Sequence, residues 1–568
     1  MEDGTSTPES EPVPDDEQPA IPLDSALEFS SPQRGAFIRA STGPTVEVAG
    51  KVSDAVGRPL TINGTPVTYA ADGTFRTLVM PKIGTNVIIA KLGDDGASAQ
   101  RSFVYGRFVA ATESVPSAVA LRVNASGFDD GNADLDDLST VAEEALAARN
   151  VMTLFPSSFN VSAPVVGTLR VSLPTRSAGR PNVRLAPRTG GVTGAVSLPS
   201  VYVKFDVAFN CLFTTCHVTG NVTSTRADLS LPVSIAVANG TLSAAGGSVG
   251  LTLVGFDYDI DGSLGGLAET VINFFIPDVR QRLESFLRAQ IAKALPADVG
   301  VTLSQLSVPT SLTMPAPLSG RVNFAQRFDA ASFSSTGGTI AAAVRASATF
   351  ASGDPGLAAP GWLAVDSPVG TYRTTPAFGV SIANDFMNQI LFAVWGQGSF
   401  DVDLPALDGT STPGGTLGPV ETKALTPPVV VGAQGALTIG VGDFMVTTTL
   451  DGEPFELVAS LTSSLEVSLL TASSTARLEL VGTPTFVVEV LKAPAHLNKG
   501  QLNDLLGALG SVLVIKLLDA VRVPVPRIPL AGIVPAYATK TLKLSSPAEV
   551  VIGGPSGRTT LYGRLSSP

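Results

Sequence analysis

The stretch from Ser263 to Pro296, SLGGLAETVINFFIPDVRQRLESFLRAQIAKALP, decides the fold, because it is the most strongly helical segment in a sequence that otherwise predicts strands. Its apolar residues recur at intervals of three and four, which places them on one face of a helix. That face is too wide for a surface helix, so we expect a broad apolar partner to cover it. Pro277 fits only a first turn or a kink, so we expect the helix to break there. The apolar residues are Leu267, Val271, Phe274, Phe275, Val279, Leu283, Phe286, Leu287 and Ile291.

The composition predicts a multidomain chain with a large apolar surplus. A length of 568 residues exceeds what one core supports, so we expect two to four domains. Apolar residues make up 44% of the chain and charged residues only 15%. The longest apolar stretch, Leu505 to Val521, is interrupted by Lys516 and Asp519, which excludes a spanning helix there. The surplus is therefore buried within the protein or against an apolar ligand.

The net charge of -12 argues against two classes of partner. Nucleic acid binding depends on Lys and Arg at the phosphates, and adhesion to an anionic membrane also needs basic residues. The two cysteines, Cys211 and Cys216, lie within NCLFTTCH. They could form a short-loop disulfide in an oxidising compartment, remain free thiols, or bind a metal with His217, although no fourth ligand is visible.

The N-terminal part divides into a tether and a small β-domain. Residues 1–32 are rich in Glu, Asp, Pro, Ser and Thr, which predicts a disordered acidic tether, and no apolar leader precedes them. Residues 33–108 alternate with period two between the turn pairs Asn63-Gly64, Asp72-Gly73 and Asp95-Gly96, which indicates antiparallel hairpins in a β-sandwich. The order of these turns resembles bacterial immunoglobulin-like modules, which implies a spacer or an adhesive unit.

The rest of the chain contains the same order of elements twice, a helix, then strands, then a longer helix. An amphipathic helix that begins in the acidic run Asp134, Asp136 and Asp137 is followed by strands and then by the long helix. Later, FGVSIANDFMNQILFAVWGQGSF (378–400) predicts a strand end and a helix, strands follow over 428–490, and Lys499–Val521 is a second apolar helix. Two similar units are implied.

This order and four phrases resemble bactericidal/permeability-increasing protein and its lipid-transfer relatives, the TULIP superfamily. The phrases are SAVALRVNASGFDD, VINFFIPDVRQRLESFLRAQIAKAL, FGVSIANDFMNQILFAVWGQGSF and KLLDAVRVPVPRIPLAGIVPAYATKTLKLSS. The resemblance covers roughly residues 117–565. It implies an α+β, mostly β chain in which two barrels, each a twisted antiparallel sheet wrapped on a long helix, flank a central sheet. The implied ranges are 117–310 for the first barrel, 311–375 with 538–565 for the central sheet and linker, and 376–537 for the second barrel.

The resemblance also implies apolar barrel pockets that hold lipid acyl chains. Members of the family link a strand to the long helix by a disulfide, whereas Cys211 and Cys216 are close in sequence, and the namesake is basic, whereas this chain is acidic. We therefore do not expect this chain to neutralise lipopolysaccharide, but the resemblance still implies that it carries phospholipid or another apolar lipid. The alternative for each lining residue is ordinary core packing. The expected lining is Val141, Ala145, Leu267, Val271, Phe274 and Phe275 in the first barrel and Ile390, Val394, Leu502, Leu506 and Leu509 in the second.

Motifs for catalysis and for metal binding are weak. The string around Ser248, GGSVG, matches a nucleophile elbow, but strands are predicted on both sides and the chain has two histidines, His217 and His496. Asp257, Asp259 and Asp261 match the first half of a calcium loop, yet the twelfth position is Ala268, so a strand with these side chains in water is preferred. A loop of Asp130, Asn132 and Asp134 lacks the glycine at its sixth position and is interpreted as a solvated helix start.

We therefore expect a non-enzymatic lipid carrier of the bacterial cell envelope, without a cofactor or resident metal and with transient membrane contact. The alternative is a structural or adhesive surface protein whose barrel cores are filled.

Overall fold

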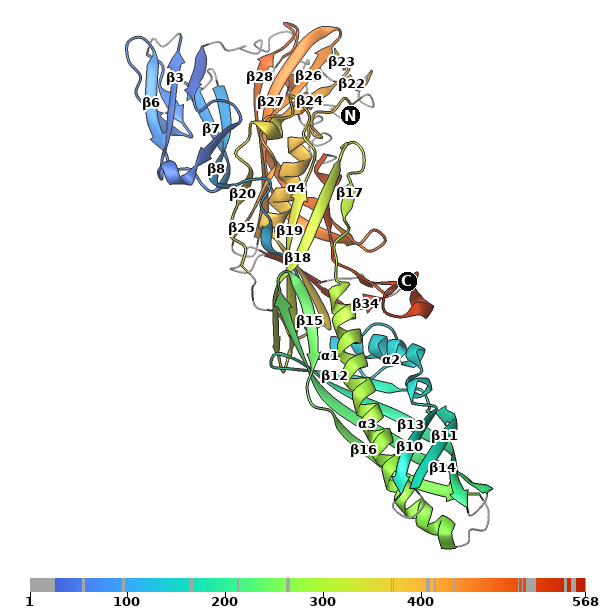
Figure 1. Cartoon of the computed structure of the whole chain (residues 1–568). Coiled ribbons are helices and arrows are strands. Elements are labelled where there is room, and N and C mark those ends of the chain that lie inside the picture. Colours follow the sequence, from blue (N-terminus) through green and yellow to red (C-terminus); the bar gives the residue numbers. More distant parts are fainter. Residues whose placement is uncertain are drawn as a thin grey trace, which may run out of the picture.

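The computed structural model is elongated, with a small β-sandwich and one curled sheet at one end and a second curled sheet with a long helix at the other (Figure 1). A seven-stranded sheet joins the two ends. The fold is α+β and mostly β. Within the part of the chain that the structure describes, no helix is long and apolar enough to cross a membrane. The described residues are 26–53, 57–93, 98–163, 167–211, 214–261, 266–368, 370, 372–404, 409–412, 415–433, 436–498, 500–502, 504–506, 517–545, 549–552 and 558–566, without the side chains of 163, 211, 266–274, 433 and 552.

The sandwich begins earlier than its composition suggests. One sheet contains β1 (Leu27–Ser31), β3 (Val46–Val52) and β6 (Thr74–Val79). The other has the order β2 (Ala36–Arg39), β8 (Ser98–Val109), β7 (Gly84–Leu92), β4 (Leu60–Ile62) and β5 (Thr65–Val67). Because β1 pairs with β3, the predicted tether boundary at residue 32 is wrong by at least five residues. Asn63 and Gly64 both have positive φ between β4 and β5, as a two-residue hairpin requires. Asp95-Gly96 lies outside the described residues.

The sandwich is docked on the second barrel. Arg34 donates to Glu489 at 2.7 Å and to Asp443 at 3.5 Å. The Asp443 carboxylate is fully buried and also accepts from the backbone N–H groups of Gly35 and Ser102 at 3.1 Å. Burial raises the pKa of Asp443, and the Arg34 guanidinium opposes that rise. Gly442 permits this approach, because a Cβ there would lie 2.3 Å from Ser102 Oγ. The spacer expected from sequence is thus an integral part of the fold.

The central sheet takes strands from both predicted barrels. Its order is β17 (Ser311–Thr313), β18 (Arg321–Ser334), β19 (Gly337–Ser347), β9 (Val115–Asn124), β21 (Phe378–Ala383), β33 (Arg558–Gly563) and β32 (Glu549–Ile552). The expected boundaries at 117 and 376 therefore placed β9 and β21 in the wrong units. Helix α4 (Asn384–Gly396) follows β21 directly, as predicted, and every residue in it is buried.

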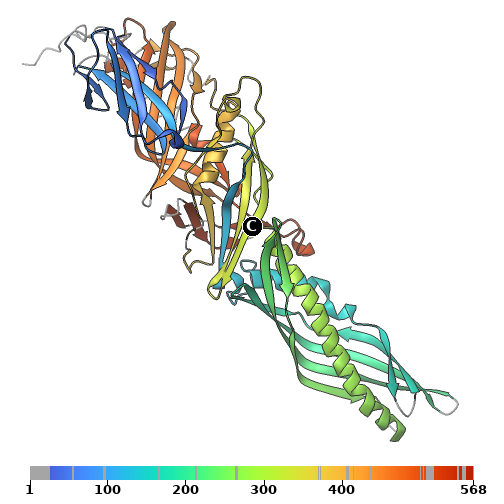
Figure 2. The same ribbon diagram turned by 60° about the vertical axis from the view of Figure 1, so that its left-hand side comes forward.

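The first barrel is a curled sheet closed by a helix. Its main order is β10 (Ser158–Ala163), β11 (Gly167–Ser177), β13 (Gly191–Cys211), β14 (Thr214–Ala238) and β15 (Thr241–Gly246), while β12 (Asn182–Arg188) pairs with β13 and β16 (Gly250–Ile260) with β14. Helix α3 (Gly266–Ser304) runs along it (Figure 2). The expected break at Pro277 is wrong, because α3 continues through Pro277 and Pro296. Buried Phe275 and Val279 anchor the helix on both sides of Pro277.

Two further helices start in this region. The four-residue α1 (Ala125–Phe128) leads into an acidic loop, and α2 (Leu138–Arg149) follows it. Asp137 caps α2 by accepting from the Thr140 backbone N–H, which agrees with the predicted helix start. A short 3-10 helix, η3 (Val151–Leu154), then leads into β10.

The second barrel contains a sheet in the order β24 (Glu421–Ala424), β26 (Ala436–Leu450), β27 (Glu453–Leu470), β28 (Thr475–Lys492) and β29 (Arg522–Pro524), and β25 (Val429–Ala433) pairs with β26. Strand β20 (Trp362–Ala364) pairs with β8 and ties the sandwich to this half. The predicted helix Lys499–Val521 is helical at 500–502, 504–506 and 517–519, whereas residues 520 and 521 are not helical. Residues 499, 503 and 507–516 lie outside the described residues.

The remaining elements are short: η2 (Ala40–Thr42), η4 (Pro355–Leu357), β22 (Ser411–Thr412), β23 (Gly415–Thr416), β30 (Ile528–Pro529), η6 (Pro535–Tyr537), β31 (Thr541–Leu544) and β34 (Leu565–Ser566).

Candidate functional site

One row of α3 side chains fills the described part of the space between this helix and the first-barrel sheet. Phe275, Val279, Leu283, Leu287, Ile291 and Leu295 are all fully buried. The rings of Phe275 and Phe205 on β13 are 4.8 Å apart and nearly perpendicular, which is a favourable aromatic geometry. Along this row, the chain's own side chains occupy the interior.

The sequence-predicted lining residues with described side chains lie in the core. Val141 and Ala145 on α2, Phe275 on α3, and Ile390 and Val394 on α4 are at most 2% exposed. Leu502 is buried, and Leu506 is half-buried against the same core. None of these residues lines any of four pockets that were identified among the described residues. Leu267, Val271, Phe274 and Leu509 fall outside the described side chains, so the lining set stays a prediction.

A pocket opens instead beside α3, where the helix meets one edge of the sheet. It has a volume of about 480 Å³ and is called the seam pocket here. Phe155 and Pro156 precede β10 and Phe159 lies on it, and the Phe155 ring lies 4.6 Å from that of Phe286 on α3. The other α3 residues that line it are polar: Asp278, Gln281, Arg282 and Ser285.

Two arginines fasten α3 to strands near opposite edges of the sheet. The Arg282 guanidinium lies 4.6 Å from the ring centre of Phe159 on β10, and the Arg280 guanidinium lies 5.0 Å from that of Phe256 on β16. Arg282 also pairs with Asp278 at 2.5 Å and donates to the backbone oxygen of Asn160. Side chains two positions apart on a helix point about 200° apart, so the pair can reach both sides. Helix α3 is therefore held by cation–π contacts at its two sides as well as by its buried row.

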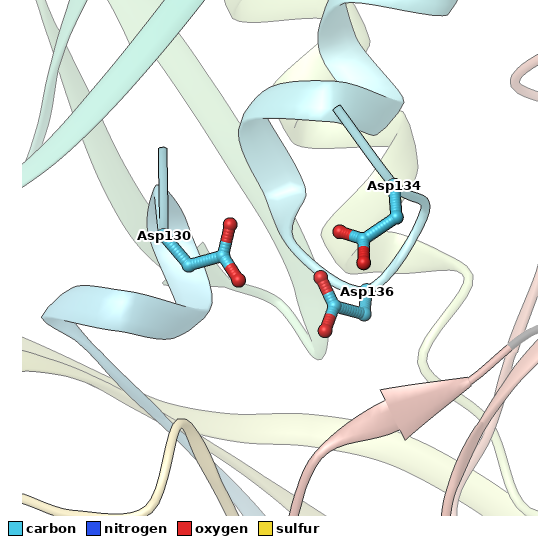
Figure 3. A group of neighbouring side chains, drawn as sticks. All are labelled: Asp130, Asp134 and Asp136. Carbon is cyan, nitrogen blue, oxygen red and sulfur yellow. The ribbon is translucent and has the colours of Figure 1, made fainter. Parts of the chain in front are cut away.

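An acidic group lies between α1 and α2. Asp130, Asp134 and Asp136 converge (Figure 3), with one carboxylate oxygen from each within 4.8 Å of the others. Burial raises the pKa of Asp136 to about 6, and a hydrogen bond with Asp134 and the charge of that neighbour add to the effect. Hard oxygen ligands of this kind suit Ca²⁺. The loop motif in the sequence includes Asp130 and Asp134 but not Asp136, which lies close to them in the folded loop.

The other candidate motifs have structural roles. Asp257 and Asp259 lie on the extended strand β16, and Asp261 accepts from the Thr219 hydroxyl, so the strand interpretation holds. Ser248 is exposed between β15 and β16, with strands on both sides. Asp206 contacts His217 at 2.8 Å. Cys216 is disulfide-bonded, and the one other cysteine in the sequence, Cys211, has a side chain outside the described set.

Two solved structures resemble this chain remotely. No protein-family model matches the chain, and no curated protein is detectably similar to it in sequence. A crystal structure of lipopolysaccharide binding protein aligns over 80% of this chain and 100% of its own, with 14% identity and a TM-score of 0.45. The structure of P47 of Clostridium botulinum E1 aligns over the same shares, with 9% identity and a TM-score of 0.22. These scores are too low to carry an argument about function.

Proposed function

We propose that the protein is a non-enzymatic lipid carrier that holds an acyl chain in the seam pocket of the first barrel. The observation that carries the proposal is the composition of this pocket, in which Phe155, Phe159 and Phe286 supply an apolar wall and α3 supplies a polar one. A volume of about 480 Å³ lies within the range, roughly 300–1,000 Å³, of pockets that take small organic ligands. This two-sided lining suits an amphipathic molecule.

The energetics of acyl transfer fit a carrier. Each methylene that leaves water gains about 0.8 kcal/mol, but a bilayer offers the same gain, so exchange between pocket and membrane is nearly balanced. The polar wall decides how the lipid is oriented. Because Arg282 and Asp278 pair at 2.5 Å, they present both signs of charge to a zwitterionic or neutral head group.

The bonded state of Cys216 supports an oxidising compartment, such as the bacterial cell envelope, because disulfides are rare in reducing compartments. We place the carrier there. The filled row of α3 and the docked sandwich favour the alternative of a rigid structural protein, which differs from the carrier in one measurable property: it takes up no lipid.

Filling the seam pocket tests the proposal. Ser285 is exposed on α3 and lines the pocket, so Ser285→Trp places a ring in it without disturbing the core. Ala289, one turn further along the same side of α3, is also exposed and does not line the pocket, so Ala289→Trp is the matched control. We expect native mass spectrometry to show bound lysophosphatidylcholine on the wild type and on the control, and a loss of at least about tenfold in affinity for Ser285→Trp. Equal loading of both variants, or a wild type that takes up no lipid, would refute the proposed site.

A further inference from the structure

One end of the sandwich presents large apolar side chains to solvent. It comprises residues 39–46 and 76–84 and is called the sandwich tip here. Leu78 is 64% exposed, Met80 83% and Ile83 54%. Met80 has the highest value among the exposed large apolar side chains of the described residues. Side chains of this kind are normally scattered singly over a surface, whereas these three fall within six residues.

The two segments form one surface. Val46 pairs with Val79, which brings the start of β3 to the end of β6. Gly84 pairs with Tyr105, whose hydroxyl donates to the backbone oxygen of Gly43 at 2.8 Å. Residues near 43 and near 83 therefore lie at the same end of the sandwich.

The loop that carries Met80 and Ile83 has a fixed shape. The Asn86 side chain accepts from the Lys82 backbone N–H at 2.8 Å and donates to the backbone oxygens of Lys82 at 2.7 Å and Gly84 at 3.0 Å. Because the loop is already ordered, insertion of its side chains into another phase costs little conformational entropy.

The charge of the tip differs from that of the chain. The whole sequence has a net charge of -12, yet residues 39–46 and 76–84 contain Arg39, Arg76 and Lys82 and no acidic residue. Arg76 pairs with Glu47 at 2.8 Å. Among the described residues, neither Arg39 nor Lys82 has an ion-pair partner. Two basic groups thus flank an apolar projection.

From this arrangement we infer that the sandwich tip docks on a phospholipid bilayer, with Met80, Ile83 and Leu78 in the interfacial region and Lys82 and Arg39 at the phosphates. Apolar projections with basic groups beside them match a surface that is apolar below and anionic at its edge. A second copy of the chain fits less well, since a stable interface buries roughly 1,200–2,000 Å² and three side chains on a short projection supply a small part of it. This docking goes beyond the proposed carrier activity, because the tip belongs to the sandwich and the seam pocket to the first barrel. The sandwich and the first barrel lie at opposite ends of the molecule (Figure 1).

Vesicle co-sedimentation tests the inference. The probes are vesicles of phosphatidylcholine and vesicles of phosphatidylcholine and phosphatidylglycerol in equal parts. We expect the wild type to bind both and to bind the anionic vesicles more tightly. The double variant Met80→Asp/Ile83→Asp should lose at least about tenfold in affinity for both. Lys82→Glu should lose at least about fivefold, and only on anionic vesicles.

The control is Leu357→Asp, which changes a leucine of similar exposure, 62%, in η4 and should bind vesicles as the wild type does. Equal sedimentation of the wild type and the double variant would overturn the inference, as would an equal loss in Leu357→Asp. A wild-type dimer that the double variant abolishes, without vesicle binding, would also overturn it and assign the tip to self-association. Lysophosphatidylcholine loading separates the two proposals, because the double variant should load normally and Ser285→Trp should sediment normally.

Discussion

Helices α3 and α4 are both rich in apolar residues, but the structure holds them in different ways. All residues of α4 are buried, and two of its polar side chains bond to neighbouring elements: Asn388 to Leu363 and Val430, Gln389 to Glu113 and Ala346. Helix α3 buries one row and leaves an exposed face, from which Arg280 and Arg282 reach strands on either side. Helix α4 is thus packed on all sides, whereas α3 is held by contacts at its two sides and borders the seam pocket.

Because α4 is packed on all sides, a substitution in it should lower the free energy of unfolding the most. Trp395 is 2% exposed, donates from Nε1 to the Ala424 oxygen at 2.7 Å and contacts Phe392. Trp395→Ala should lower the free energy of unfolding by about 3–5 kcal/mol, measured by denaturant titration. Phe286→Ala on α3, which removes a half-buried ring, should cost about 1–2 kcal/mol. Equal losses would remove the distinction between the helices.

The C-terminal end of α3 should make the free energy of unfolding depend on pH. Burial raises the pKa of Asp298 from 3.8 to about 6, against the opposing charge of Arg149. Between about pH 4 and pH 6 the folded chain keeps this proton and the unfolded chain does not, so stability falls as pH rises through this window. The loss attributable to Asp298 is about 3 kcal/mol.

Denaturant titrations from pH 4 to pH 7 check this value. The wild type should lose that stability relative to Asp298→Asn, whose side chain does not titrate. Parallel curves for the two proteins would contradict the assignment.

The contacts between the sandwich and the second barrel also distinguish the two helices, because they stabilise the end of the molecule that holds α4. Arg34→Ala removes the paired cation from buried Asp443 and one of two from half-buried Glu489, which keeps its contact with Arg101 at 3.6 Å. We expect a loss of about 2 kcal/mol, less than for a fully buried pair because the Arg34 side chain is 19% exposed. Thermal unfolding with limited proteolysis should show the sandwich released first. Cleavage of the first barrel before the sandwich would contradict a stabilising role for Arg34 between the sandwich and the second barrel.

The smallest effect on stability should come from the arginine contacts of α3. Arg280→Ala/Arg282→Ala removes two exposed cation–π contacts, worth about 0.5–1 kcal/mol each. Exchange of lysophosphatidylcholine should nevertheless accelerate, because the helix margin opens more often and the pocket loses the Arg282 guanidinium. An unchanged exchange rate would mean that α3 does not control access to the seam pocket.

Local sequence patterns predicted elements better than contacts between distant segments. The segment 378–400 predicted a strand end followed by a helix, as found in β21 and α4, and the acidic run that includes Asp137 predicted the start of α2. The break at Pro277 was wrong because packing on both sides of the proline outweighs the loss of one backbone donor. The membership of β9 and β21 in the central sheet was also missed, since the two paired strands lie far apart in the sequence and no local pattern records their pairing.

The candidate site was less predictable for the same reason. Phe155 and Phe159 precede α3 by more than a hundred residues, and they meet Phe286 and Arg282 only because the sheet curls. The sequence identified the apolar row of α3 but could not tell filled core from pocket, because both use the same side chains. Asp136 joins Asp130 and Asp134 through a turn at Gly131, whose φ of 83° is a property of the folded loop.

Hydrogen–deuterium exchange with and without lysophosphatidylcholine tests the central claim most directly. We expect amides of α3 between residues 275 and 291 to exchange faster than those of α4 in the free protein, and lipid to slow exchange in α3 and in β10 but not in α4. If lipid leaves α3 unchanged, or protects both helices equally, the seam pocket is not the place where the acyl chain binds.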